Sequence, residues 1–124
     1  MIKYPFVLES DNVMYVDIDE TLVLWEATSE QKQKYGVDFD HFGEPAVLVP
    51  HKKHIQIIKN SKARGHTIVF WSQGGYEWCK QIVTKLGLLG YADAILSKPK
   101  WFLDDLPSSA FMPEANRIYK KDEE

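Results

Sequence analysis

The chain has 124 residues, 44% of them hydrophobic, which indicates a single domain (1–124) with a buried core. Its formal net charge of −3 argues against a general nucleic-acid binder, because such domains are normally strongly basic. Its one cysteine, Cys79, excludes an internal disulfide. The first residues lack the apolar stretch of a leader peptide, and no run approaches the roughly 20 apolar residues of a membrane span, so we expect a soluble, cytoplasmic protein.

Apolar runs of strand length alternate with segments of helical length. The strand-like runs are residues 13–16, 67–71, 92–96 and 100–103. Residues 51–64 and 76–86 are predicted to be helices, because each carries apolar residues at helical spacing and is followed by a glycine. This alternation predicts βαβ units, an α/β fold and a parallel sheet with right-handed crossovers. Past Leu106 we expect a short helix around 114–119 and a charged tail, 120–124, that frays.

Residues 22–49 form an insert after the first predicted strand. Two short apolar runs, 22–25 and 46–49, flank a polar middle from Glu26 to Glu44. The two runs are suited to pair with each other as a hairpin. We therefore expect a small flap here, with its polar middle contributing to specificity.

Two carboxylates and a hydroxyl follow the first strand at alternate positions, as Asp17, Asp19 and Thr21. If residues 13–16 are a buried strand, Asp17 arrives at its carboxyl end, where open α/β sheets bind ligands. Burying two neighbouring carboxylates is costly unless a metal ion or a reacting group uses their charge. The pattern therefore predicts a functional site.

The stretch Asp17-Ile18-Asp19-Glu20-Thr21 resembles the first signature of the haloacid dehalogenase superfamily of phosphohydrolases. In that superfamily a second strand ends in Ser or Thr, a Lys precedes a later strand, and that strand ends in acids. The candidates follow in the same order over residues 13–106: Ser72 with Gln73 and Gly74, then Lys98 or Lys100, then Asp104 with Asp105. The resemblance implies a Rossmann-like three-layer sandwich around a central parallel sheet, in a nearly capless member.

The resemblance also implies a Mg²⁺-dependent phosphatase that cleaves phosphate monoesters through an aspartyl-phosphate. Asp17 would be the nucleophile, and Asp19 would protonate the leaving group and later activate water. Ser72 and Lys98 would complete the catalytic set by holding the phosphoryl oxygens and offsetting their charge.

Two ligand sets follow from the same resemblance. The implied magnesium ligands are oxygen atoms, the type that Mg²⁺ prefers, from Asp17, Asp19, Asp104 and Asp105. The implied substrate-binding residues are Thr21, Ser72, Gln73, Gly74, Lys98 and Lys100. Lys98 and Lys100 compete for one role, because Lys98-Pro99 resembles the usual Lys-Pro pair of the superfamily but lies unusually close to Asp104.

Structural alternatives exist at these positions. Asp17 and Asp19 suit a helix cap and a turn, Ser72 suits a helix cap, and Asp104-Asp105 suits an acidic turn. An EF-hand loop is excluded because Leu22 stands where that loop needs glycine. The four histidines lack ligand spacing, and the basic residues of 52–64 indicate a solvated face, with contact to a nucleic-acid or nucleotide phosphate as the alternative.

Three functions are compatible with this sequence: a hydrolase, a phosphotransferase that passes the aspartyl-phosphate to an acceptor other than water, and a catalytically silent binding module. An uncapped site would admit a phosphorylated small molecule or macromolecule, including a nucleic-acid end, or would be covered by a second copy in a homo-oligomer.

Overall fold

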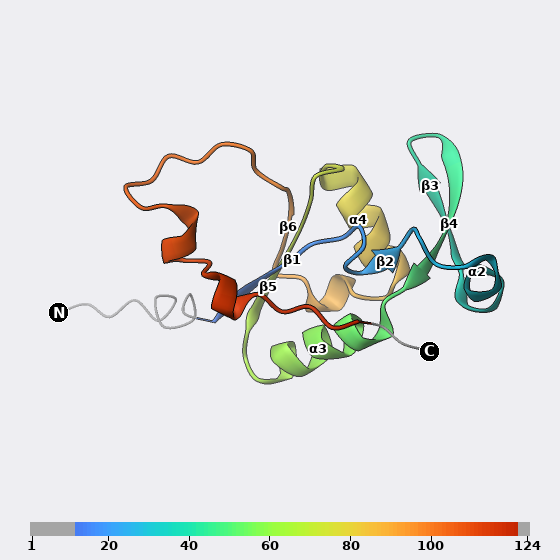
Figure 1. The fold of residues 1–124 in the computed structure, drawn as a ribbon, viewed down its shortest axis with the longest axis horizontal. Helices are drawn as coiled ribbons and strands as arrows, with labels where there is room; N and C mark the ends of the chain where they lie inside the picture. Colours follow the sequence, from blue (N-terminus) through green and yellow to red (C-terminus); the bar gives the residue numbers. More distant parts are fainter. Residues whose placement is uncertain (1–11, 122–124) are drawn as a thin grey trace.

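A computed structural model describes residues 12–121 of the chain (Figure 1). Residues 1–11, where we expect no leader peptide, and residues 122–124 of the predicted tail lie outside this range. The described part holds a parallel sheet in the order β1-β5-β6 and an antiparallel sheet in the order β2-β4-β3. The predicted α/β fold with a parallel sheet is thus confirmed.

The parallel sheet consists of β1 (Val13–Val16), β5 (Thr67–Ser72) and β6 (Ala94–Ser97). Helix α3 (Lys52–Ala63) precedes β5, and α4 (Tyr76–Lys85) with the 3₁₀ turn η1 (Leu89–Tyr91) links β5 to β6. Because the strands follow chain order in space, right-handed crossovers place both helices on one face of the sheet. One core joins these elements through Val16, Ile58, Ile68, Phe70, Cys79, Ile82 and Val83.

The insert begins with a short strand and a helix. Strand β2 (Val23–Leu24) pairs antiparallel with the end of β4 (Glu44–Pro50), which confirms that the runs 22–25 and 46–49 pair. The predicted hairpin between these two runs is wrong, because further regular structure lies between them and the strand that precedes β4 forms the hairpin. Helix α2 (Ser29–Tyr35) starts with a reciprocal capping box between Thr28 and Gln31. This helix lies inside the predicted polar middle, where we did not predict regular structure.

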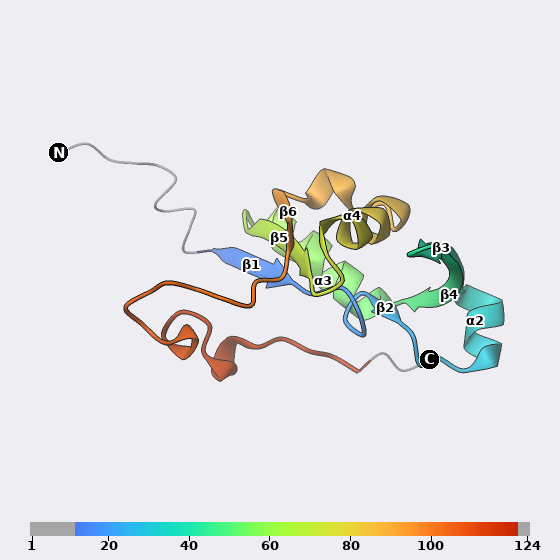
Figure 2. The same ribbon diagram turned by 90° about the horizontal axis from the view of Figure 1, so that it is seen from above.

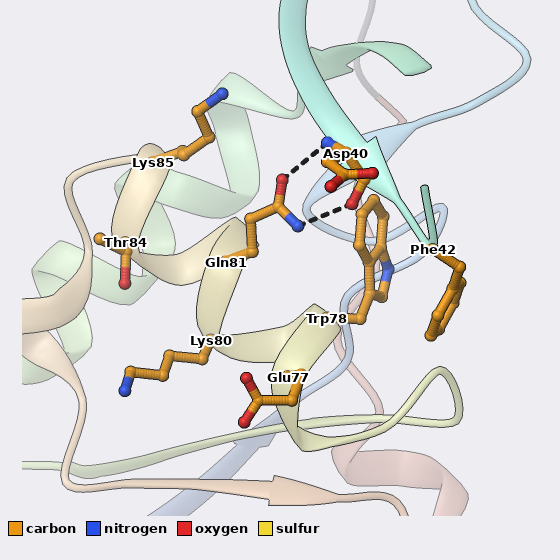
Figure 3. Close-up of a pocket in the computed structure, with 8 residues that line it drawn as sticks. All are labelled: Asp40, Phe42, Glu77, Trp78, Lys80, Gln81, Thr84 and Lys85. Carbon is orange, nitrogen blue, oxygen red and sulfur yellow. Dashed lines mark hydrogen bonds between the residues drawn. The ribbon is translucent and has the colours of Figure 1, made fainter. Parts of the chain in front are cut away.

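Strand β3 (Val37–His41) and β4 form a hairpin that packs against α4. Phe42 and Gly43 close it at φ values of 55° and 89°, as a two-residue type I′ turn requires. The side-chain amide of Gln81 accepts from the N–H of Asp40 and donates to its C=O, both at 2.8 Å (Figure 3). The hairpin is therefore tied to the helix that links β5 to β6.

After β6 the chain leaves the sheet as a C-terminal arm, residues 98–121 (Figures 1 and 2). The predicted fourth strand at 100–103 is wrong, since the arm holds only the 3₁₀ turns η2 (Ser108–Ala110) and η3 (Glu114–Asn116). Trp101 and Leu103 are 91% and 104% exposed, so that the apolar run gains no burial that would favour a strand. Pro99 also has no N–H to offer a sheet. The helix predicted around 114–119 is reduced to η3.

In the described range, no helix combines the length and the apolar character needed to cross a bilayer.

Asp93 ties the start of β6 to β5. Its N–H donates to the C=O of Ile68 at 2.8 Å, and its Oδ2 accepts from the N–H of Ile68 at 2.8 Å and from Lys62 Nζ at 2.8 Å. The hydrogen bond from Lys62, followed by that from Ile68, lowers the pKa of Asp93.

Because the folded-state pKa of Asp93 is lowered, its ionised form stabilises the fold above the unfolded value of 3.8, and this contribution is lost as pH falls through the folded value. We expect Asp93→Asn to lower the free energy of unfolding at pH 7 by about 0.5 kcal/mol, a small effect because solvent screens the partly exposed pair. Urea unfolding at pH 7 and at pH 3 checks this. A deficit that does not shrink at pH 3 would contradict it.

Candidate active site at the carboxyl ends of the parallel strands

The ends of β1, β5 and β6 bring three predicted site residues to one edge of the sheet. Val16 pairs with Phe70 and Ser72 pairs with Ser97, so Asp17 and Lys98 each follow directly after a paired strand. The N–H of Lys98 donates to the C=O of Ser72 at 2.8 Å. Lys98 Nζ lies 3.9 Å from Asp17 Oδ1, with the two side chains 34% and 33% exposed. This is an ion pair that a ligand can still reach.

The loop after Asp17 is held by apolar residues between the polar ones. Ile18 and Leu22 are fully buried, and the C=O of Ile18 accepts backbone hydrogen bonds from Thr21, Leu22 and Val23 at 3.1, 2.7 and 3.3 Å. Glu20 takes a φ of 61°, a left-handed conformation that costs a non-glycine residue roughly 1–2 kcal/mol. Such strain is characteristic of functional loops whose surroundings fix them.

Thr21 and Lys98 determine how Asp17 presents its carboxylate. The hydroxyl of Thr21 donates to Asp17 Oδ2 at 3.2 Å, while Lys98 faces Oδ1. The two oxygens therefore have different surroundings, and Oδ1 is the one paired with a cation.

Asp19 has an environment that the sequence did not reveal. Trp25 Nε1 and Trp78 Nε1 both donate to its Oδ1, at 2.8 and 3.1 Å. Trp25 follows β2, whereas Trp78 lies in α4 and is only 3% exposed. Nothing in a linear sequence pattern pairs an indole N–H with one particular carboxylate, so this contact could not be predicted from the sequence.

The turn after β5 contains Ser72, Gln73 and Gly74. Ser72 is fully buried, and its hydroxyl accepts from the N–H of Gly74 at 3.0 Å, so it shapes the turn. A Cβ on Gly74 would lie 2.8 Å from the Trp78 ring, which is why only glycine fits. Gln73 is exposed at the surface of this turn. Gly75, with a φ of 100°, leads into α4, and the N–H of Tyr76, the first residue of that helix, donates to the hydroxyl of Ser97 at 3.0 Å.

Cys79 lies behind the carboxylates in the first turns of α4 and is fully buried. Burial, followed by the charges of Asp17 and Asp19, raises the pKa of the Cys79 thiol to about 12. The thiol is therefore neutral at physiological pH and is excluded as a nucleophile.

The predicted magnesium ligands do not come together. Asp104 and Asp105 are exposed on the arm, where Asp104 Oδ1 accepts from the N–H of Leu106 at 3.0 Å. Lys100 also lies exposed on the arm. Across residues 12–121, no group of three or more His, Cys, Asp or Glu side chains is placed to hold a metal ion. The residues therefore do not fit a magnesium ion in this arrangement.

A groove of about 1470 Å³ separates the site from the arm. Asp17, Thr21 and Lys98 line it on the site side, and Trp101 and Phe111 line it on the arm side. Its sheet wall carries the rings of Tyr15 and Trp71, whose centroids lie 4.4 Å apart, and Lys98 Nζ lies 5.7 Å from the Trp71 ring. This volume admits a ligand much larger than phosphate.

Two buried histidines hold the end of the arm beside the site. The rings of His51 and His54 stack at 3.5 Å. His54 Nε2 accepts from the N–H of Lys120 at 2.8 Å, so its Nδ1 donates to the C=O of Thr21 at 2.7 Å. His51 Nδ1 accepts from the N–H of His54 at 3.2 Å, so its Nε2 donates to the C=O of Lys120 at 2.7 Å. The tail expected to fray from Lys120 is thus hydrogen-bonded at that residue.

Neither protein-family models, nor curated proteins, nor solved structures gave a match to this chain. Its function is therefore inferred from its residues and their geometry.

We expect Cys79 to resist thiol reagents in the folded protein. With its pKa raised to about 12, only about one thiol in ten thousand is ionised at pH 8, and the thiolate is the reactive form. Modification by a disulfide reagent at pH 8 should be at least roughly 100-fold slower in the native protein than in urea. Similar rates in the two conditions would contradict the buried, charge-repelled thiol.

Proposed function

We propose that this protein is a phosphohydrolase that cleaves phosphate monoesters with Asp17 as nucleophile. The observation that carries the proposal is the ion pair of Asp17 with Lys98 at the ends of parallel strands, with a second carboxylate, Asp19, two residues further on. The resemblance to the haloacid dehalogenase superfamily supports the same assignment. We also propose that the whole fold is the three-layer sandwich of that superfamily.

In the first step, Asp17 Oδ1 attacks phosphorus and the ester oxygen departs, which forms an aspartyl-phosphate and releases an alcohol. Repulsion between the carboxylate and the phosphoryl oxygens opposes this approach. Lys98 lies beside Oδ1 and offsets that charge, while Thr21 holds Oδ2 and so fixes the direction of attack.

In the second step, water attacks the aspartyl-phosphate and restores Asp17 with release of phosphate. Asp19 serves both steps: it gives a proton to the leaving ester oxygen, and it then takes a proton from the attacking water. Its Oδ1 is engaged by two indole N–H groups, so Oδ2 is the atom that transfers the proton.

The turn after β5 supplies the phosphate contacts in this proposal. Ser72 is too deeply buried to touch a ligand directly, and it acts by shaping the turn that presents Gln73 and Gly74. The start of α4 favours an anion at the same place. Lys100, on the arm, lines the groove that receives the rest of the substrate.

The main test is hydrolysis of p-nitrophenyl phosphate by the wild type and by Asp17→Asn. The variant keeps the shape of the side chain but removes the nucleophile, so we expect kcat to fall by at least about 10³-fold. Asp38→Asn, an equivalent change of an exposed carboxylate on β3, is the control and should keep full activity. Equal turnover by Asp17→Asn and the wild type would refute the assignment.

Magnesium dependence is a separate prediction, which derives from the resemblance alone. The resemblance implies turnover with millimolar Mg²⁺ and at least about tenfold less in EDTA, whereas the described residues form no magnesium site in this arrangement. Undiminished turnover in EDTA would show that the reaction needs no metal ion, and it would leave the assignment of Asp17 as nucleophile unchanged. No step described above passes through a metal ion.

A catalytically silent binding module is the second candidate, and the separation of Asp104 and Asp105 from Asp17 favours it. It predicts that a panel of phosphorylated metabolites, nucleotides and oligonucleotide ends yields binding without release of phosphate. Transfer of phosphate to an added alcohol, in preference to water, would instead indicate a phosphotransferase.

A further inference from the structure

We infer that Trp25 and Trp78 are positioning residues that select which oxygen of Asp19 transfers the proton, and that the β3–β4 hairpin holds Trp78 in place. This inference rests on the proposed function, in which Asp19 is the general acid and base. It adds two residues and one structural element to that chemistry.

Both indoles converge on one atom. Trp25 Nε1 and Trp78 Nε1 donate to Asp19 Oδ1 at 2.8 and 3.1 Å, and they come from segments that lie 53 positions apart in the chain. An indole N–H can only donate, so neither tryptophan can accept the proton that Asp19 carries. A proton on Oδ1 would face two donors, and the arrangement therefore directs the proton to Oδ2.

Aromatic rings pack against the two indoles of this contact. The ring of His41, at the end of β3, lies 4.8 Å from that of Trp25 and 4.6 Å from that of Trp78. Phe39 approaches Trp78 at 6.1 Å. In such surroundings, hydrogen bonds to an ionised carboxylate are stronger than in water.

The hairpin fixes Trp78 through two contacts (Figure 3). Phe42, at its tip, stacks on Trp78 with a centroid separation of 6.4 Å and an interplanar angle of 28°. Gln81, one turn after Trp78 on α4, pairs with both backbone groups of Asp40. Phe42, Trp78 and Gln81 line a cleft of about 470 Å³ between the hairpin and the helix. The insert therefore supports the site from behind as well as flanking it.

Packing alone does not account for this arrangement. A buried indole N–H needs one acceptor, and any nearby carbonyl would satisfy it. Here two indoles share one oxygen of the residue assigned to proton transfer. A purely structural role predicts a change in stability, whereas a positioning role predicts a change in the proton-transfer step.

The test compares Trp25→Phe and Trp78→Phe, which remove the N–H and keep a ring, with Trp101→Phe. Trp101 is 91% exposed on the arm, so its variant is the matched control. We expect roughly 10- to 100-fold lower kcat in the first two variants, with KM changed less than about twofold. The loss should be greater for an alkyl phosphate than for p-nitrophenyl phosphate, because a poor leaving group depends more on the general acid.

The pH profile gives an independent readout. The Trp25→Phe and Trp78→Phe variants each remove a donor to Asp19 Oδ1, so the pH dependence of kcat should shift away from that of the wild type, whereas Trp101→Phe should keep the wild-type profile. The other titratable groups around the contact, Asp17, Glu20, His41, Cys79 and Lys98, are unchanged in every variant. If Trp78→Phe does not fold, Trp25→Phe and Gln81→Ala carry the test, and Gln81→Ala should show a smaller shift in the same direction.

A spectroscopic measurement separates this inference from the proposed function. In ¹⁵N-labelled protein, Asp19→Asn should shift the indole signals of both Trp25 and Trp78, because both donate to Asp19 Oδ1, and it should leave the signal of Trp101 in place. If the wild type hydrolyses no phosphate ester, the proposed function fails, and the indole signals still test the shared contact. If the wild type is active but both tryptophan variants match Trp101→Phe in kcat and pH profile, the inference is overturned.

Discussion

The parallel register of β1, β5 and β6 is the constraint on which the site depends. It places Asp17, Ser72 and Lys98 at three adjacent strand ends, and a slip of one residue would turn each side chain to the opposite face. Burial of Val16, Ile68 and Phe70 secures that register, at roughly 1.5–3 kcal/mol for each large side chain. This gain outweighs the strain at Glu20, so the loop can hold an unfavourable conformation beside two carboxylates.

The insert combines two roles that would otherwise need separate elements. Its first strand and loop deliver Trp25 to Asp19, and its hairpin packs on α4 behind Trp78. Helix α4 is thus in contact with the hairpin on one side and with the carboxylates on the other. The insert thus supplies one wall of the site and the support behind it.

The sequence predicts those parts of this protein whose structure is determined by residues that are neighbours in the chain. The runs 13–16 and 67–71 are apolar enough to be strands, although β1 is not the buried strand that we expected, since only its Val16 is buried. The strand pattern places Asp17 at the carboxyl end of β1, and the resemblance places Lys98 beside it. The contacts of Trp78 with Asp19, and of His54 with Lys120, join distant segments and leave no local pattern. The apolar character of residues 100–103 predicts a strand, because apolar residues are usually buried. The sequence does not show whether a partner strand is available to pair with them, and among the described residues none is.

The C-terminal arm explains why the acid pair lies apart from the site. Its start is fixed by the hydrogen bond between Lys98 and Ser72, and its end by Lys120 on the two histidines. The segment between these anchors, which carries Asp104 and Asp105, is exposed at every residue except the half-buried Pro113. Within the described residues β1 pairs only with β5, so the backbone groups on the other edge of β1 are unpaired and no strand beside Asp17 carries the acid pair. To bind a divalent ion together with Asp17, either arm carboxylate would have to move with this segment, and the free-energy cost of that rearrangement would be subtracted from the affinity for the ion.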